Sequence, residues 1–253
     1  LDVAIGGSIN DRITNSTRID SKNASLKYAN VFNLANIVMS SSASIDQKID
    51  AHYQLQSVFA TAQIGYKEGV FLDLTARNDW SSTLAYTKYE KKGFFYPSVG
   101  VSFLPDKWVK MPEWVSFSKL RGAYSIVGNG VPPFITYPVS YVTAGGEILA
   151  SDAAPFAEMK PEMTHSVELG MEWKFLQHRL GLNLTYYRTD TYEQFFKLPA
   201  LAGDKYAYRY VNAGDIRNQG WEITLDATPV LTPDFTWKTS LNFSANKNKI
   251  VEL

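Results

Sequence analysis

Three histidines and one spaced pair of carboxylates are the residues of this sequence that could do chemistry. Histidine can serve as a metal ligand, a general base or a proton shuttle near neutral pH. His52, His165 and His178 have no partner at the spacings that metal sites use. The His165-Ser166 dipeptide lacks the glycine-flanked turn that exposes a nucleophilic serine. We therefore interpret the histidines as surface or loop-end residues, and the sequence predicts neither a metal nor a cofactor.

The carboxylate pair is Glu168 and Glu172, which share one face of an alternating segment. Paired carboxylates can act as acid and base in glycoside hydrolysis. They are also the ordinary solvated surface of a strand whose other face is apolar. The segment Gly128-Asn129-Gly130 is interpreted as a turn, not as a phosphate-binding loop. The sequence thus predicts no catalytic residue and a protein that is not an enzyme.

Aromatic side chains concentrated in two non-repeating segments are the remaining candidates for binding. Such rings stack on sugars or peptides and occupy the centres of protein interfaces. They would also pack one loop against another, or against a partner chain, and the sequence leaves both interpretations open. The candidate ligand- or partner-binding residues are Tyr137, Tyr141, Tyr192, Phe195, Phe196, Tyr206, Tyr208 and Tyr210.

Charge and cysteine content narrow the class of protein. Lysine plus arginine and aspartate plus glutamate each total 25, so the basic excess that nucleic-acid binding needs is missing. Cysteine is absent from the sequence, which removes disulfides and thiolate metal sites. No run of 18 apolar residues predicts a transmembrane helix. A membrane β-barrel stays open, because its strands alternate and their mean hydropathy is low.

Alternation of apolar and polar residues is the main structural signal, and it is clearest in residues 212–253. Trp221 and Ile223 begin an apolar face that alternates with charged and hydroxyl side chains, and a second alternating run comes after a short turn. Side chains of a strand alternate between two faces, so this pattern predicts a β-hairpin. Pro229 and Pro233 are expected to end the pairing on either side of the turn, because proline has no N–H to donate.

Similar alternation predicts about nine antiparallel strands. Those before the hairpin are expected at 1–9, 53–66, 70–80, 94–104, 117–127, 163–175 and 179–192. Long connections would then share one side of the sheet, at 10–52, 81–92, 129–162 and 193–215. Shorter connections would share the other side, at 67–69, 105–116, 176–178 and 229–234. Outer-membrane barrels have this asymmetry, with short periplasmic turns and longer extracellular loops.

A soluble β-sandwich would also alternate, with its apolar faces turned inward. Two features favour a barrel. The strands run to roughly ten residues or more, which is long for a sandwich and suits a tilted membrane strand. Aromatic residues also stand on the apolar faces near strand ends, as in the aromatic girdles of a membrane barrel. These residues are Trp173, Tyr186, Trp221 and Trp237.

Specific motifs accompany the alternation. The last hairpin carries Asn212, Gly214, Ile216, Asn218, Gly220 and Glu222, followed by Thr228-Pro229, Phe235-x-Trp237 and Asn242-Phe243-Ser244. Earlier strands carry Asp73-x-Thr75-x-Arg77-x-Asp79, Lys119-Leu120-Arg121 and Lys160-Pro161-Glu162. Through these motifs, residues 54–253 resemble the SusC/RagA family of TonB-linked outer-membrane transporters. Residues 1–53 match the family only in general character.

The resemblance implies an all-β fold, an antiparallel up-and-down transmembrane β-barrel segment of about nine strands from a larger, 22-stranded type of barrel. Residues 1–253 would be part of the barrel domain, and we expect a fragment that lacks the plug domain, the N-terminus and the closing strands. It also implies localisation in the outer membrane. The activity would be TonB-dependent import of glycans, oligosaccharides or peptides. The partners would be a SusD-like surface lipoprotein, TonB through the missing plug, and outer-membrane lipid. A surface β-sheet binding module or adhesin without transport is the alternative.

Overall fold

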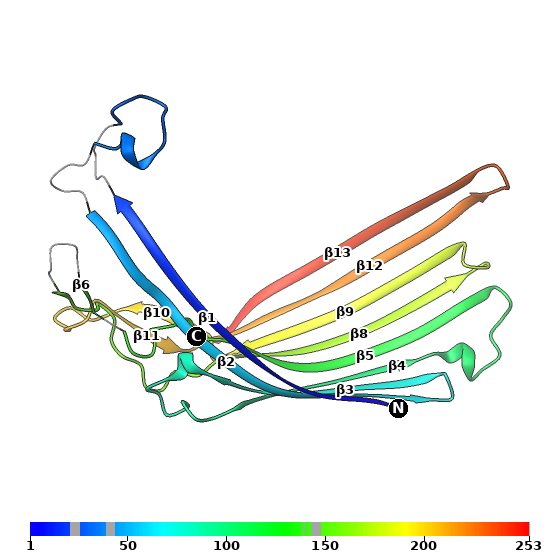
Figure 1. The fold of residues 1–253 in the computed structure, drawn as a ribbon. Coiled ribbons are helices and arrows are strands. Elements are labelled where there is room, and N and C mark those ends of the chain that lie inside the picture. The colour runs from blue at the N-terminus through cyan, green and yellow to red at the C-terminus, as the bar shows by residue number, and fades with distance from the viewer. Residues whose placement is uncertain (21–25, 39–43, 139, 143–147, 253) are drawn as a thin grey trace.

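Nine long strands in one antiparallel sheet dominate the computed structural model, which describes residues 1–20, 26–38, 44–138, 140–142 and 148–252 (Figure 1). They succeed one another across the sheet in chain order, as a meander. They are β1 (Asp2–Asp20), β2 (Ser44–Tyr66), β3 (Val70–Ser81), β4 (Phe94–Phe103), β5 (Val115–Asn129), β8 (Glu162–Phe175), β9 (Leu180–Tyr192), β12 (Asp215–Leu231) and β13 (Thr236–Glu252). The all-β, antiparallel up-and-down architecture predicted from the sequence is confirmed.

Shorter elements lie in the connections between these strands. Two small hairpins pair β6 with β7 and β10 with β11. The connections also contain three single turns of 3₁₀ helix, one of them in the 105–116 connection. The bounds are β6 (Tyr141–Val142), β7 (Ile148–Leu149), β10 (Phe195–Pro199), β11 (Tyr208–Asn212), η1 (Leu34–Asn36), η2 (Ser82–Leu84) and η3 (Pro105–Lys107).

The first connection is shorter than the sequence predicted. A strand at 1–9 and a loop at 10–52 were expected, but β1 continues to Asp20 and β2 begins at Ser44. The extra length pairs residue by residue, with one register shift between Thr14 and Asn15. The sequence of this part is mostly polar and has no sustained apolar alternation that would mark it as strand. Backbone pairing needs no such period, since every residue supplies the same N–H and C=O groups.

The sequence predicted that Pro229 would end the pairing of the last hairpin, and this prediction is wrong. Strand β12 runs through it, and Val230 stands opposite Trp237 on β13. A register shift between Ala227 and Val230 places the proline in a bulge, where no ladder N–H is required. The turn comes three residues later and is closed by the Thr232 N–H, which donates to the Phe235 carbonyl at 2.9 Å.

The connections separate by length between the two ends of the sheet (Figure 1). The long connections that contain β6, β7, β10 and β11 lie at one end, and the tight turns lie at the opposite end. The prediction that long connections share one end of the sheet and short connections share the other is therefore confirmed.

The strand register sorts the sheet into an apolar and a polar face. Residues directly opposite one another on paired strands point to the same side. One row across five strands is Gly122, Leu169, Tyr186, Trp221 and Ala245, and the next is Leu120, Met171, Leu184, Ile223 and Phe243. The apolar faces predicted strand by strand thus join into one continuous band.

Hydrogen bonds connect side chains on the polar face. The Arg121 Nη2 donates to Thr185 Oγ1 at 2.6 Å, and its Nε lies 3.2 Å from Glu168 Oε1. Near the other edge of the sheet, Gln63 Nε2 donates to Asp73 Oδ1 at 2.7 Å. The polar face is therefore a surface of side chains that hydrogen-bond to one another and can be exposed to water.

The apolar band is not covered by any element among the described residues. Ile5 is 82% exposed, Leu241 65% and Leu169 55%. The buried apolar residues in the described part of the chain are Leu84, Val131, Ala153 and Met159, all of which lie in connections between the long strands. A soluble monomer rarely exposes so extensive an apolar surface. The band requires an apolar environment outside the chain.

Candidate functional site

Three long connections pack together at one end of the sheet, in the described parts of residues 82–93, 130–161 and 193–214. We call this assembly the cap. Leu84, Val131 and Met159 form its buried core. Partly buried side chains packed against that core are Tyr89, Phe94, Ile135, Phe156, Phe195 and Tyr210. The cap therefore has an apolar core of its own, separate from the uncovered band of the sheet.

Backbone hydrogen bonds join the three connections of the cap. The Lys88 N–H donates to the Ala157 carbonyl at 3.2 Å, and the Ala154 N–H donates to the Tyr208 carbonyl at 3.0 Å. The Thr136 hydroxyl donates to the Ala85 carbonyl at 3.0 Å. These bonds link each connection to another that is distant in sequence, so the cap is one packed unit.

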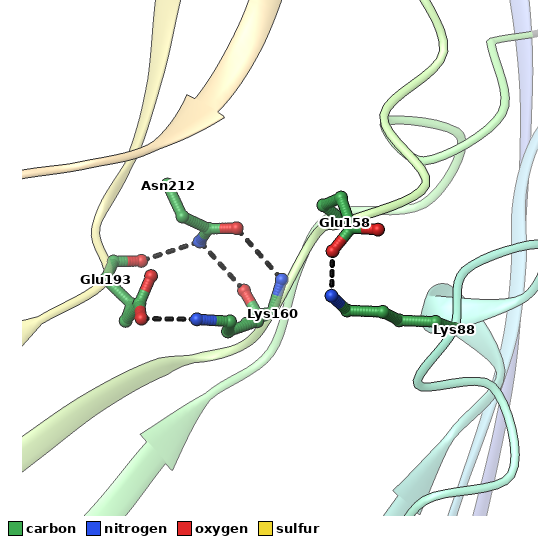
Figure 2. Close-up of polar contacts among 5 residues, drawn as sticks. All are labelled: Lys88, Glu158, Lys160, Glu193 and Asn212. Carbon is green, nitrogen blue, oxygen red and sulfur yellow. Dashed lines mark hydrogen bonds and ion pairs between the residues drawn. The ribbon is translucent and has the colours of Figure 1, made fainter.

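Asn212 fastens two of these connections where they meet the sheet (Figure 2). Its Oδ1 accepts from the Lys160 N–H at 2.9 Å. Its Nδ2 donates to the carbonyls of Lys160 and Glu193, at 3.0 and 2.7 Å. The Lys160 Nζ also lies 2.5 Å from Glu193 Oε1, and this hydrogen bond raises the pKa of the lysine. A primary amide has the donors and the acceptor that this contact uses.

Two neighbouring features complete the fastening. Lys88 and Glu158 form an ion pair beside it, and the hydrogen bond to Glu158 raises the pKa of Lys88 (Figure 2). Gly214 has a φ of +85°, a conformation that favours glycine. A Cβ built there would lie 2.9 Å from the Phe196 ring, so the close approach also requires glycine.

The structure brings some of the predicted binding residues together inside the cap. Phe195 and Tyr210 stand edge to face with ring centroids 6.4 Å apart, and both contact the cap core. Tyr208 lies edge to face with Tyr210 at 5.9 Å, and the Lys197 ammonium lies 3.5 Å from its ring centroid. These contacts support a packing role for this group of rings.

The other predicted binding residues are dispersed. Tyr192 lies at the end of β9 against the His165 ring, at a centroid distance of 5.1 Å. Phe196 approaches Gly214, and Tyr206 is half-buried beside Lys205, whose ammonium lies 5.5 Å from its ring centroid. Tyr141 belongs to β6, but its side chain lies outside the described residues.

Tyr137 is the predicted residue most open to a ligand, and it has a partner that the sequence reasoning missed. Its ring lies 4.9 Å from the ring of Tyr86, with exposed fractions of 53% and 72%. Tyr86 has a φ of 65°, a left-handed conformation unusual for tyrosine. Strained residues of this kind cluster at ligand sites. The available signal was the expected placement of 81–92 and 129–162 on the same side of the sheet.

The chain matches the model of the family described as "TonB dependent receptor-like, beta-barrel" over residues 5–250. The chain belongs to this family. The nine-stranded sheet is accordingly a section of a TonB-dependent receptor barrel wall, and the barrel lies in the outer membrane.

Curated relatives agree with this assignment. A TonB-dependent receptor from Formosa agariphila is 29% identical over 79% of this chain and 21% of its own length. The TonB-dependent receptor SusC from Bacteroides thetaiotaomicron is 28% identical over 69% of this chain and 19% of its own length. The chain thus spans about a fifth of the length of the curated relatives it matches.

Solved structures share the fold. The RagAB peptide transporter aligns with a TM-score of 0.79 at 20% identity, covering 99% of this chain and 28% of that chain. The outer membrane transporter YddB from Escherichia coli aligns with a TM-score of 0.60 at 13% identity, covering 98% and 30%.

In this TonB-dependent receptor barrel the polar face is the lumen wall. The two glutamates considered for catalysis each form an ion pair there: Glu168 with Arg121 at 3.2 Å and Glu172 with Lys174 at 3.0 Å.

Across the described ranges, no group of three or more potential metal ligands is close enough to hold an ion. In the same ranges, no helix is long and apolar enough to cross a membrane. The family is one of receptors, not a class of enzymes.

Proposed function

We propose that this chain is part of the barrel wall of a protein that imports ligands actively across the outer membrane. TonB supplies the energy for this import. One observation carries the proposal: a lumen wall of hydrogen-bonded polar side chains ends in a packed cap, two of whose connections are joined through Asn212 where they meet the sheet. Loops held on a rigid scaffold are where recognition is usually built. The relative SusC is named a TonB-dependent receptor, and RagAB, which shares the fold, is named a peptide transporter; both names support the proposal.

The proposed ligands are glycans, oligosaccharides or peptides. The exposed Tyr86–Tyr137 pair supports this choice, because aromatic faces stack on sugar rings and on peptide side chains. Neutral contacts of this kind suit a chain without net charge. The similarity in fold to the RagAB peptide transporter keeps peptides beside glycans among the candidates.

The proposed partner is a SusD-like surface lipoprotein that covers the outer end of the barrel and docks on the cap. Long loops on the extracellular side are the surface that such a lipoprotein would meet. A surface binding module without transport is the competing function. The two functions diverge once the ligand has bound, since only import requires TonB.

The deciding experiment compares growth and uptake in a strain deleted for the full-length gene and in the same strain complemented with it. Labelled oligosaccharides and peptides of defined composition are supplied, with and without an intact TonB system. We expect accumulation of one ligand class only when both the receptor and TonB are present. Ligand that binds the cell surface equally in TonB-positive and TonB-negative cells, and never enters, would establish the binding module instead.

A further inference from the structure

A patch of cations lies on the lipid-facing side of the wall, where the apolar band ends. We call it the outer basic patch; it consists of Arg188 on β9, Arg217 on β12, and Lys247 and Lys249 on β13. The register places Arg188 and Lys247 in one row, on either side of Gln219. In the next row Asp190, Arg217 and Lys249 stand opposite one another. Adjacent strands lie about 4.8 Å apart and rows about 7 Å apart, so the four cations occupy a compact area.

The patch belongs to the lipid-facing register and not to the lumen. Arg188 lies two residues after Tyr186 on β9, and Arg217 precedes Trp221 by four residues on β12. Residues separated by two or four positions on a strand point to the same side. Tyr186 and Trp221 stack with ring centroids 4.9 Å apart and belong to the continuous apolar band.

The height of the patch matches the level of lipid headgroups. Trp221 and Trp237 mark the two edges of the band, and Val230 of β12 stands opposite Trp237. From residue 221 to residue 230 a strand rises about 30 Å, which a tilt of 35–45° reduces to roughly 21–25 Å. An outer-membrane barrel has an apolar band about 25 Å tall between its aromatic girdles. The patch begins one row beyond the girdle on the side of the long loops.

Asp190 organises the patch without cancelling its charge. Its Oδ2 accepts from Arg188 Nε at 2.7 Å, and its Oδ1 accepts from Arg217 Nε at 2.6 Å. Within these two rows, one carboxylate among four cations leaves an excess of positive charge, and the next row outward is acidic, with Asp215 opposite Glu252. Both guanidinium groups contact Asp190 through Nε and not through their terminal nitrogens. Guanidinium groups with ordered positions are well suited to bind phosphate.

The other half of the wall has no such patch at the matching positions. The lipid-facing residues beyond the band on β1, β2 and β3 are neutral or acidic: Ile9, Asp11, Gln54, Gln56 and Trp80. Asp11 lies 2.8 Å from the His52 ring. The positive charge is therefore a property of β9, β12 and β13 that the matching rows of β1, β2 and β3 do not share.

We propose that the outer basic patch binds the phosphate groups of an anionic lipid in the outer leaflet of the outer membrane. Its position is continuous with the lipid-facing band, and its charge complements a phosphorylated headgroup. Cations at a membrane surface each strengthen binding by a similar factor, roughly fivefold. The patch would hold one lipid at a fixed place on the barrel, below the cap.

The test uses the full-length protein purified in detergent and measures lipid binding by native mass spectrometry. The probes are bisphosphorylated lipid A, its monophosphorylated form and inorganic pyrophosphate. The wild type should bind the bisphosphorylated lipid more tightly than the monophosphorylated lipid. A Lys247→Gln/Lys249→Gln variant should bind the lipid roughly 25-fold more weakly. Both lysines are exposed, so their replacement leaves the fold intact.

The matched control is Lys119→Gln/Lys238→Gln, which removes two cations from the lumen face and should leave lipid binding unchanged. An Asp190→Asn variant removes the central carboxylate and should retain the lipid. Equal lipid binding by the wild type and the Lys247/Lys249 variant would overturn the proposal. Binding of pyrophosphate without the lipid would also overturn it, as would loss of a co-purifying protein from that variant with unchanged lipid binding.

Discussion

Apolar side chains are exposed on one face of the wall and buried in the core of the cap. On the wall, Leu241 and Leu169 are more than half exposed, and the polar side chains of the other face are hydrogen-bonded to one another. In the cap, Met159 is fully buried within a small core formed with Leu84 and Val131. The wall therefore needs lipid on one side to cover its apolar residues, whereas the cap buries apolar residues in a core of its own. The change from an exposed apolar surface to a buried apolar core occurs where β8, β9 and β12 join the cap.

Met159→Ala should have the largest effect, and it should act on the cap alone. Removing a fully buried methionine from a small core costs about 2–5 kcal/mol, because part of the cavity remains. We expect faster amide hydrogen exchange in residues 130–161 and 193–214, with unchanged exchange in β8 and β9.

The control for this prediction is heat-modifiable migration on gels, which reports barrel assembly and should stay at the wild-type level. A variant that fails to assemble would mean that cap and wall form one cooperative unit, contrary to the separation described above.

Leu182→Arg should act on the wall. Leu182 lies in the apolar band opposite Trp173 and Leu225, so arginine there would meet the lipid. The expected cost is about 2–4 kcal/mol near the membrane midplane. Asn183→Arg, one residue along, points into the lumen and should cost much less, because one residue reverses the direction of the side chain.

Denaturant unfolding of the full-length protein in lipid vesicles measures both variants. Equal destabilisation by the two arginines would contradict the assignment of the faces.

Asn212→Leu tests the hydrogen bonds that join two connections of the cap where they meet the sheet. The substitution removes contacts to Lys160 and Glu193 and leaves partly buried backbone groups without these partners. Each such group costs about 1–3 kcal/mol. We expect limited proteolysis to cleave residues 193–214 more rapidly. Asn246→Leu on the lumen face of β13 is the matched control and should leave cleavage unchanged. A protease-resistant Asn212 variant would show that the cap is held by its core alone.

Sequence patterns predicted the wall far better than the cap. Alternation placed β8 at 163–175, against Glu162–Phe175 in the structure, because lipid on one side imposes a period of two. The same logic missed the outer part of β1, whose sequence is mostly polar and has no sustained apolar alternation. Asn212 was noticed as a motif residue, but its role depends on Lys160 and Glu193, which only folding brings near. The Tyr86–Tyr137 pair was missed for the same reason, since 51 residues separate the rings in sequence.

Tyr86→Ala/Tyr137→Ala should have the smallest effect on stability and act on binding alone. Both rings are exposed, and an aromatic pair contributes roughly 0.5–1.5 kcal/mol. We expect weaker ligand capture by cells, up to about tenfold, with normal barrel assembly. Phe195→Ala/Phe196→Ala is the contrasting variant and should loosen the cap. Unchanged capture by the tyrosine variant at matched surface levels would remove this pair from the proposed ligand surface.

The most direct test of the central claim, that one face of this wall meets lipid and the other meets water, is a cysteine scan along β9. This chain contains no cysteine, so single substitutions from Leu180 to Tyr186 introduce unique probes in a full-length protein cleared of any others. A hydrophilic maleimide is applied to intact outer membranes. We predict a period of two, with reaction at positions 181, 183 and 185 and protection at 180, 182, 184 and 186. Uniform reaction, or reaction in the opposite phase, would contradict the account.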